Sequence, residues 1–536
     1  MAMELRKYQS EAVEAVFREW GSGRRRTLLV CPVGSGKTIM FAKVAERVAM
    51  QGKRTLVLAH RGELLDQARD KIAKVTGLAC SVERAEETSV GTWESITVGS
   101  VQTLMRDSRL SRMGPDRFGA IIIDEAHHAA SDSYRKILDY FTGANVLGVT
   151  ATPDRADRKN LGTVFDSLAY EYSLPSAIRD GYLCPIRAQS IPLNIDITGV
   201  STQSGDYAVG ELGDALEPYL EAIASEMVKA GCDHRKTVVF LPLVRTAKRF
   251  RDILCDHGLR AAEVDGQSDD RAEVLEDFQR GRYDVLCNSM LLTEGWDCPS
   301  VDCIVVLRAT KSRSLYSQMV GRGTRLSPET GKDHLLLLDF LWMTGRHELC
   351  RPASLVARIP DVAARVTETI AGAQGSLDLM ETEEQSEKDV QEEREAALAE
   401  ELRKQRHKRA KLVDPLQYEM SIMDIDLQNY EPEFAWQERK PTDKQLQTIE
   451  KFGINSDGVR DAGFATMLLD RLFKRADMGL ATPKQIRFLE SKGFRHVGEW
   501  TREQASKMIG AISKNNWRVP PSIVPSEYVP KHEAEA

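Results

Sequence analysis

The feature that most constrains the fold is a pair of successive series of short apolar segments separated by amphipathic stretches. Within each segment the residues are apolar throughout, which is typical of parallel strands covered by helices on both faces. Two such series predict an α/β chain with two tandem, doubly wound domains. The expected strands are 26–32, 54–60, 95–100, 119–128 and 144–153 in the first series, and 236–242, 260–266, 283–289, 301–309 and 334–340 in the second.

The length of 536 residues also requires several domains, because a single hydrophobic core does not grow to that size. The pattern changes twice after the second series, first to a densely charged stretch and then to a repeated helical one. We therefore expect five parts, which are a first α/β domain (1–185), a second (186–375), a charged helical linker (376–435), tandem helix–loop–helix repeats (436–520) and a flexible tail (521–536).

Composition excludes some classes of protein. The chain has 73 Lys and Arg against 80 Asp and Glu, a net charge of −7, so it does not bind nucleic acid by bulk charge alone. Its nine cysteines include no pair at C-x-x-C spacing, which argues against a structural zinc site and favours free thiols in a reducing cytoplasm. We find no signal-peptide pattern at the start and expect no membrane span, since the most apolar stretch, 335–343, contains Asp339.

The charged stretch has an ordered polarity. Residues 376–402 hold eleven acidic and two basic residues, and residues 403–411 hold six basic residues and no acidic one. Acidic residues at the start and basic residues at the end match the helix dipole, so we predict one long, solvated linker helix. The alternative is that the basic run contacts phosphates.

The C-terminal part contains an internal repeat at an offset of forty residues. The segment TDKQLQTIEKFGI at 442–454 matches TPKQIRFLESKGF at 482–494, and the match continues without a gap into a second apolar segment. Each unit is predicted to be a helix opened by a threonine and closed by a glycine, followed by a loop and a second helix. Residues 436–519 contain sixteen Lys and Arg against ten Asp and Glu, a local charge of +6.

The strongest candidate site is the segment CPVGSGKT at residues 31–38, between an expected strand and an expected helix. Glycine-containing loops at this place turn backbone amides toward phosphates. Gly34, Ser35 and Gly36 would shape the loop, Lys37 would reach the β- and γ-phosphates, and Thr38 would be a ligand of Mg²⁺. Cys31 departs from the general motif, which has glycine there.

The second candidate site is the segment AIIIDEAHH at residues 120–128. Its apolar strand brings two adjacent carboxylates to the carboxyl edge of the sheet, where ligands bind in α/β proteins. Asp124 would hold Mg²⁺ and Glu125 would polarise the attacking water. Taken alone, the segment could be a surface turn; together with a phosphate-binding loop it predicts a nucleoside-triphosphate site.

With these two segments, Thr150-Ala-Thr152 and the segment QMVGRGTR at 318–325, in that order, the chain resembles a superfamily 2 helicase over about residues 4–345. The DEAHH segment resembles the XPB- and UvsW-like DNA helicases more than the DEAD-box RNA helicases, and the replacement of glycine by Cys31 is common among them. The resemblance implies two RecA-like domains, ATP and Mg²⁺ as cofactors, and a cytoplasmic location in a bacterium or in a phage-infected cell.

The resemblance also implies roles for individual residues. Gln9 would read adenine, Gly295 and Asp297 would lie at the junction of the ATP and nucleic-acid sites, and Gln318 would belong to the site contributed by the second domain. Arg322 and Arg325 would reach the γ-phosphate as arginine fingers. The residues expected to couple hydrolysis to strand binding are Thr150, Thr152 and His127.

Candidate nucleic-acid contacts rest on the same resemblance. Hydroxyls, helix N-termini and single arginines at these positions would hold backbone phosphates without reading bases. For each of them a cap or turn role is an equal alternative, because serine and threonine also favour those positions. The candidates are Arg61, Ser100, Gln102, Thr103, Arg245, Thr246 and Thr293.

The repeats resemble C-terminal modules of phage and bacterial helicases. Their exposed basic residues, with Trp500 and Trp517, would form a phosphate-and-stacking surface or would bind a protein partner. The alternative for the aromatic residues is that Trp500, Phe488 and Phe494 form the small core of each unit. The bases concerned are Lys484, Arg487, Lys492, Arg495 and Arg502.

The leading hypothesis is therefore a DNA-dependent ATPase that moves along DNA and unwinds it, in repair, recombination or replication. Three alternatives stay open: an RNA helicase, a double-strand DNA translocase that does not separate strands, and a clamp or adaptor whose affinity ATP switches.

Overall fold

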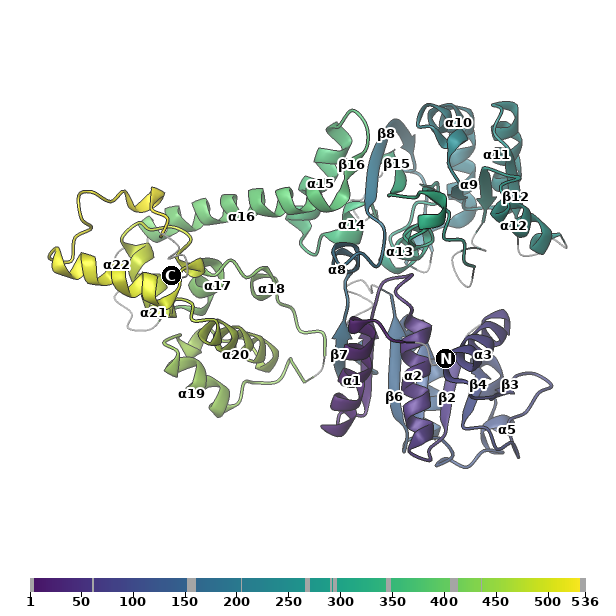
Figure 1. Cartoon of the computed structure of the whole chain (residues 1–536), viewed down its shortest axis with the longest axis horizontal. Coiled ribbons are helices and arrows are strands. Elements are labelled where there is room, and N and C mark those ends of the chain that lie inside the picture. Colours follow the sequence, from purple (N-terminus) through teal and green to yellow (C-terminus); the bar gives the residue numbers. More distant parts are fainter. Residues whose placement is uncertain are drawn as a thin grey trace. The chain divides into compact units, whose positions relative to one another are not determined.

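The computed structural model describes residues 4–59, 62–151, 161–203, 205–265, 270–289, 292, 296–343, 349–404, 413–434 and 436–530. The chain forms two compact units, Met1–Glu384 and Gln385–Ala536. The first unit contains two large sheets with helices packed around them, and the second is helical (Figure 1). We call the first unit up to residue 185 lobe 1 and its remainder lobe 2.

Lobe 1 is built on a seven-stranded, wholly parallel sheet in the order β3-β4-β2-β5-β6-β1-β7. All five strands predicted for this part are present. Two edge strands, β3 and β7, were not predicted, because β3 is only four residues long and β7 is half-exposed, so neither is a continuous apolar run. The strands are β1 (Arg26–Val30), β2 (Thr55–Ala59), β3 (Cys80–Glu83), β4 (Ile96–Ser100), β5 (Ala120–Asp124), β6 (Asn145–Thr150) and β7 (Ser167–Glu171).

Helices cover both faces of this sheet, which explains the continuous apolar runs. Leu28 and Val30 of β1 join one core with side chains of α4, α5 and α6, while Leu29 between them is buried on the opposite face. On that opposite face α1, α2 and α3 lie in sequence. The helices are α1 (Lys7–Gly21), α2 (Lys37–Met50), α3 (Gly62–Thr76), α4 (Val101–Leu104), α5 (Asp107–Leu110) and α6 (Asp132–Tyr140).

Lobe 2 repeats this plan with a seven-stranded sheet in the order β12-β13-β11-β14-β15-β8-β16, in which the short β16 is antiparallel. The five predicted strands are β11 (Thr237–Phe240), β12 (Ala261–Val264), β13 (Val285–Asn288), β14 (Cys303–Val306) and β15 (Leu335–Met343). The analysis missed β8 (Ile186–Asp196), whose apolar residues are interrupted by polar ones and a proline, and β16 (Leu377–Asp378). The two tandem RecA-like α/β domains that were predicted are confirmed.

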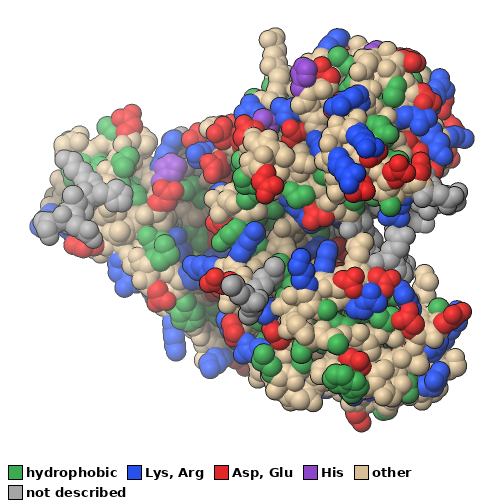
Figure 2. All heavy atoms as spheres, turned by 45° about the vertical axis from the view of Figure 1, so that its right-hand side comes forward, with side chains coloured by type: hydrophobic (Ala, Val, Ile, Leu, Met, Phe, Trp, Pro, Cys, Tyr) green, Lys and Arg blue, Asp and Glu red, His purple; other side chains and the backbone are tan. Residues whose placement is uncertain are grey.

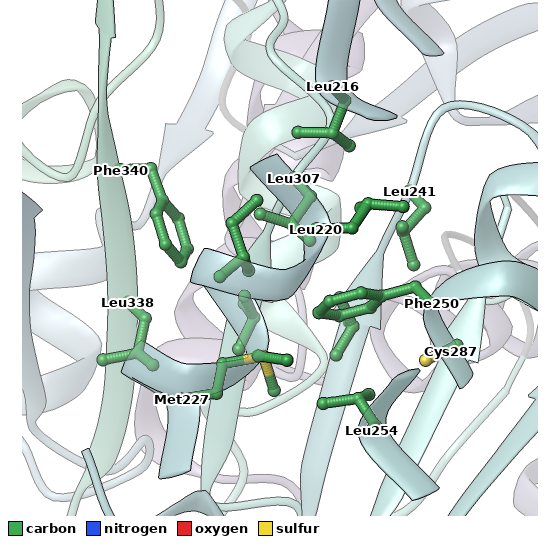
Figure 3. Close-up of a cluster of buried hydrophobic side chains, with 14 of the residues drawn as sticks. Leu216, Leu220, Met227, Leu241, Phe250, Leu254, Cys287, Leu307, Leu338 and Phe340 are labelled. Carbon is green, nitrogen blue, oxygen red and sulfur yellow. The ribbon is translucent and has the colours of Figure 1, made fainter. Parts of the chain in front are cut away.

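The core of lobe 2 lies between this sheet and three helices on one of its faces. Side chains from the strands interdigitate with Leu216, Leu220, Met227, Phe250 and Leu254 (Figure 3). The three helices are α9 (Val209–Leu216), α10 (Leu220–Lys229) and α11 (Val244–Asp256). The remaining helices of the lobe include α12 (Arg271–Gln279), α13 (Arg313–Gly321), α14 (Ala353–Val356) and α15 (Pro360–Gly372).

The charged stretch forms one helix, α16 (Leu379–Lys404), as its polarity predicted. It is not wholly solvated, because Ser386 and Val390 are buried. Most of the basic run, residues 405–412, lies outside the described residues, so its contact with phosphates stays a hypothesis.

The helices of the second unit confirm the predicted repeat. Helices α21 (Pro483–Ser491) and α22 (Arg502–Lys514) begin forty residues after α19 (Asp443–Lys451) and α20 (Ala462–Asp477). Thr442 and Thr482 cap α19 and α21 through the same reciprocal bonds with a glutamine. Each first helix is followed by a glycine, Gly453 or Gly493, with φ of +93° or +94°.

The core of this unit extends beyond the repeats. Tyr418 of α17 (Pro415–Ser421) and Leu427 of α18 (Ile425–Gln428) pack into the same cluster as the repeat helices, although the sequence analysis placed both residues in the linker. Trp500 and Phe494 are each 3% exposed in this cluster, so the core alternative is the correct one for these two aromatic residues.

A buried carboxyl in α17 predicts a pH dependence of this unit's stability. Glu419 is 1% exposed, and burial, opposed by Arg460 at 3.4 Å, raises its pKa to about 7. Because the folded pKa exceeds that of the unfolded chain, the stabilisation is present below about pH 4.5 and is lost as pH rises toward 7. We expect Glu419→Gln to remove about 2 kcal/mol of this pH dependence between pH 5.5 and 8, measured as the difference from wild type in urea unfolding at those two pH values. Equal pH profiles of the two proteins would contradict it.

Three features bear on the expectations from composition. All nine cysteines are free thiols. Among the described residues, no three His, Cys, Asp or Glu side chains are grouped as a metal site, and no helix is long and apolar enough to cross a bilayer. Acidic and basic side chains are intermixed over the face shown in Figure 2.

Candidate active site

The glycine-containing loop between β1 and α2 has the conformation that its sequence requires. Gly34 and Gly36 have φ of +86° and +81°, where other residues are strained. A Cβ on Gly36 would also lie 2.7 Å from the amide nitrogen of Gln9, and a Cβ on Gly34 would lie 3.0 Å from Leu183 and 3.4 Å from the Arg325 side chain. The loop is therefore enclosed by groups from several parts of the chain, including lobe 2.

Helix α1 holds this loop from the side. The Tyr8 hydroxyl and the Gln9 amide both donate to the Ser35 carbonyl, at 2.5 and 3.1 Å. Gln9 is 3% exposed and its amide oxygen accepts from the Arg6 backbone, while the Tyr8 ring stacks on Tyr172 at 4.2 Å. In this structure Gln9 thus supports the phosphate-binding loop, and adenine recognition by Gln9 stays a proposal.

The two carboxylates at the end of β5 lie beside this loop. The Lys37 ammonium is 3.3 Å from one Glu125 oxygen, and His127 Nδ1 is 3.4 Å from the other. Burial would raise the pKa of Glu125, but Lys37 and His127 hold it well below its usual range. Asp124 accepts a hydrogen bond from the Glu125 backbone at 3.0 Å. Glu125 is therefore ionised and already faces the lysine expected to bind phosphate.

The residues expected to hold Mg²⁺ fit the chemistry of that ion. Thr38 and Asp124 are the chain neighbours of Lys37 and Glu125, which are in contact, so a hydroxyl and a carboxylate come from the same two segments. Mg²⁺ usually takes one or two carboxylates and completes its shell with water and substrate phosphates, which agrees with so small a donor set.

Strand β6 connects the loop to the segment expected to couple hydrolysis to strand binding. The Cys31 amide donates to the Thr150 carbonyl at 3.0 Å, where β6 ends. Thr150 is fully buried and its hydroxyl has no hydrogen-bond partner among the described residues. Thr152 lies outside the described residues.

Lobe 2 contributes the arginines through a loop after α13. Arg322 donates to the Trp296 carbonyl at 2.6 Å, and Arg325 forms an ion pair with Asp297. Burial lowers the pKa of Arg325. Gln318 is 5% exposed, and its amide nitrogen is buried without a hydrogen-bond partner in the described part of the chain. The structure thus brings Gln318, both arginines and Asp297 together at one edge of lobe 2.

A half-buried lysine fixes the backbone of this arginine loop. The Lys332 ammonium donates to two main-chain carbonyls of this loop, that of Gly323 at 2.6 Å and that of Arg325 at 2.8 Å. It also contacts the carbonyls of Pro299 and Val301. Burial lowers the pKa of Lys332. A charged group at the centre of several carbonyl dipoles holds them in one arrangement, so Lys332 is a positioning residue for the loop.

The two lobes meet at the phosphate-binding loop. A Cβ on Gly321 would lie 2.5 Å from the Val33 Cβ, so the close approach of α13 to the loop needs glycine at this position. The Cys184 amide donates to the Thr324 carbonyl at 2.8 Å. The sites of the two lobes therefore face one another across a direct contact.

The candidate nucleic-acid residues divide into two groups. Gln102 and Arg245 are exposed, although Arg245 is ion-paired with Asp214. Ser100 is buried at the N-terminus of α4 and makes no side-chain cap bond. Thr103 and Thr246 are buried, so neither hydroxyl lies at the surface. The Thr103 hydroxyl accepts a hydrogen bond from the Ala85 backbone, a packing role. Of these candidates, Arg61 and Thr293 lie outside the described residues, as does Gly295, which was predicted for the ATP site.

Sequence reasoning missed Tyr8, Lys332 and Lys71. The pKa of Lys71 on α3 is lowered by desolvation and by Arg325, while Asp124 acts in the opposite direction. Lys332 and Lys71 are not part of a short motif, whereas Tyr8 lies directly before Gln9 in a segment, residues 5–9, that resembles a helicase motif.

Comparison with known families agrees with this geometry. Residues 2–155 match the family described as type III restriction enzyme, res subunit, and residues 220–327 match the helicase conserved C-terminal domain. The two lobes are those of a superfamily 2 helicase.

Relatives share the two lobes. The candidate ATP-dependent helicase IRC3 of Saccharomyces cerevisiae is 30% identical over 384 residues, which are 67% of this chain and 54% of that protein. The type I restriction enzyme EcoAI endonuclease subunit of Escherichia coli is 28% identical over 62% of this chain and 46% of its own length. The DNA 3'-5' translocase XPB2 of Sulfurisphaera tokodaii is 24% identical over 60% of this chain and 78% of its own length.

Solved structures agree at the level of the fold. A fragment of a candidate HsdR subunit of a type I restriction enzyme from Vibrio vulnificus YJ016 superposes with a TM-score of 0.50, at 27% identity, over 63% of this chain and 64% of that one. This chain spans about half the length of IRC3, so the activity of the whole protein is a matter for proposal.

Proposed function

We propose that this chain is an ATP-dependent DNA motor that hydrolyses ATP between its lobes, moves along DNA and unwinds it. The observation that carries the proposal is the contact between the two half-sites. The Lys37–Glu125 pair of lobe 1 adjoins a loop whose Gly34 packs against Arg325 of lobe 2.

The ion pairs of the site indicate how phosphate would be bound. Lys37 has Glu125 as its partner and Arg325 has Asp297. The β- and γ-phosphates would compete for both cations, which frees the Glu125 carboxylate to orient and polarise the attacking water. Mg²⁺, held by Thr38 and Asp124, would supply neutralisation of phosphate charge.

Binding in this place couples chemistry to motion. Arg322 and Arg325 come from lobe 2 and Lys37 from lobe 1, so ATP draws the lobes together and loss of the γ-phosphate releases them. Thr150, whose carbonyl bonds to the start of the phosphate-binding loop, would relay this change to the neighbouring segment, with Thr152 and His127. Exposed residues such as Gln102 and Arg245 would hold a strand by its backbone, as a motor that ignores sequence requires.

DNA is the proposed substrate because relatives that share both lobes include restriction-enzyme subunits and a protein named as a DNA translocase. The same names make a double-strand translocase without strand separation the second candidate. We place the chain near the XPB- and UvsW-like branch, in repair, recombination or replication of a bacterium or phage. RNA as substrate and an ATP-switched clamp are the remaining alternatives.

The experiment is an ATPase titration of the full chain with single-stranded DNA, duplex DNA, forked DNA and RNA, beside strand displacement on a labelled fork. We expect DNA to stimulate hydrolysis, the fork to be unwound, and Lys37→Ala to lose at least a hundredfold of the stimulated rate. If RNA alone stimulated hydrolysis, RNA and not DNA would be the substrate. DNA-stimulated hydrolysis without strand displacement would favour the double-strand translocase. A single turnover without steady-state hydrolysis would favour the clamp, and full activity of Lys37→Ala would contradict the proposed site.

A further inference from the structure

The two repeats of the second unit have nearly the same backbone but different charge. Residues 436–479 hold eight basic and seven acidic residues, and residues 480–519 hold eight basic and three acidic ones, so the second repeat carries +5 and the first +1. Two repeats with the same fold do not require different charges, so the difference of charge needs another explanation.

Three basic residues of the first repeat form ion pairs with acidic residues of the same unit. Arg471 pairs with Asp424 at 2.6 Å and with Asp426 at 3.2 Å, and Arg460 pairs with the buried Glu419. Lys474 pairs with Asp470 at 2.8 Å. These three basic residues of the first repeat are therefore matched by acidic partners.

The second repeat instead surrounds an exposed tryptophan with basic residues. Trp517 is 57% exposed, and Lys514 and Arg518 beside it are exposed without an acidic partner among the described ion pairs. The Lys492 ammonium lies over the Phe488 ring at 5.6 Å and donates to the Trp517 carbonyl at 2.8 Å. We call these residues the Trp517 patch: Phe488, Lys492, Lys514, Trp517 and Arg518.

The tryptophan is held in a fixed place although it is exposed. Its φ is +60°, in the left-handed region that non-glycine residues rarely adopt, and its amide donates to the Ile512 carbonyl at 2.9 Å. Its ring stands edge-on to Phe488 at 5.9 Å. The backbone of Trp517 is therefore in a conformation that is uncommon for a residue other than glycine, and it presents a large apolar ring to solvent.

The corresponding positions of the first repeat lack this chemistry. At the offset of forty, Trp517 replaces Asp477, Lys492 replaces Phe452 and Arg518 replaces Met478. The first repeat also has an aromatic pair, Phe452 and Phe473, with ring centroids 5.3 Å apart, but Lys474 beside Phe473 is paired with Asp470. The second repeat therefore carries both an aromatic face and unmatched cations.

We propose that the Trp517 patch is a second nucleic-acid site, on which a single-stranded segment stacks a base on Trp517 and places its phosphates against Lys492, Lys514 and Arg518. An exposed aromatic face flanked by cations fits a polynucleotide strand, whose bases stack and whose phosphates are anionic, better than it fits a protein surface. This inference rests on the proposed function in one respect, which is that the bound strand would be the strand along which the motor moves. The patch would keep that strand attached while the lobes open.

The test is binding of a fluorescent oligo-dT to the nucleotide-free full chain. We expect Trp517→Ala to weaken binding on the order of tenfold and Trp517→Phe to retain most of it, because phenylalanine still stacks. Phe473→Ala, which removes the exposed aromatic of the first repeat, is the matched control and should bind as wild type does. Arg518→Gln should reduce the slope of log affinity against log salt by roughly 0.7.

Two readouts separate contact from a loss of structure and from a failure of the motor. Oligo-dT should quench a component of tryptophan emission in wild type that is missing in Trp517→Phe, although that variant still binds. In Trp517→Ala, the DNA concentration for half-maximal ATPase should rise while the rate at saturating DNA is unchanged. Unchanged binding by Trp517→Ala, or an equal loss in Phe473→Ala, would overturn the inference. A chain that binds through Trp517 but hydrolyses no ATP would refute the proposed motor and leave the patch standing.

Discussion

Replacement of Glu125 by glutamine is expected to lower steady-state ATP hydrolysis by roughly 10²- to 10⁴-fold, which is the usual contribution of a general base. The carboxylate is ionised and faces Lys37 at 3.3 Å, so it is poised to orient water once phosphate takes the lysine. Glutamine has nearly the same shape and no charge, and therefore removes the basicity without a cavity.

Binding of ATP should separate this variant from one that loses the phosphate contact. Glu125→Gln frees Lys37 from its ion pair, so the affinity for a fluorescent ATP analogue should be equal to or greater than that of wild type. Lys37→Ala should lose both affinity and hydrolysis. Hydrolysis by Glu125→Gln at the wild-type rate would exclude Glu125 as the base, and loss of nucleotide binding in that variant would point to a structural role instead.

The second large effect is expected from Lys332→Met, which keeps the aliphatic chain and removes the ammonium. The carbonyls of Gly323 and Arg325 lose their shared donor, so the backbone that carries Arg322 and Arg325 is no longer fixed. A displacement of about 1 Å in such a group costs on the order of 10²-fold in rate. We expect kcat of the DNA-stimulated ATPase to fall by that factor with little change in the KM for ATP.

The matched control is Lys236→Met. Lys236 also donates to two main-chain carbonyls, those of Phe278 and Gln279, but these close α12 and do not belong to the arginine loop. Each replacement should cost roughly 2–4 kcal/mol of stability, measured by urea unfolding, because buried carbonyls lose a charged donor. Only Lys332→Met should lower kcat. An equal loss of kcat in both variants would mean that lost stability, and not the position of the arginines, accounts for the effect.

Much of lobe 1 and lobe 2 could be predicted because the information is local. An apolar run such as that of β5 specifies a strand covered on both faces, and glycine at Gly34 and Gly36 specifies a loop with positive φ. The repeat was equally readable, because Thr442 and Thr482 cap their helices through neighbours three residues away. Edge strands such as β7 were missed because half-exposed strands have no continuous apolar pattern.

By itself, therefore, the sequence determined the central strands of both lobes, the segments expected to form the two halves of the ATP site and the asymmetry of charge between the repeats. Only the tertiary structure decided which side chains meet. In the folded chain Lys37 forms an ion pair with Glu125, and Lys332 donates hydrogen bonds to the arginine loop. Thr246 is buried, whereas Trp517 is exposed. The physical reason is that capping, backbone conformation and apolar pattern act within a few residues, whereas ion pairs, burial and pKa shifts depend on groups brought together from distant parts of the chain.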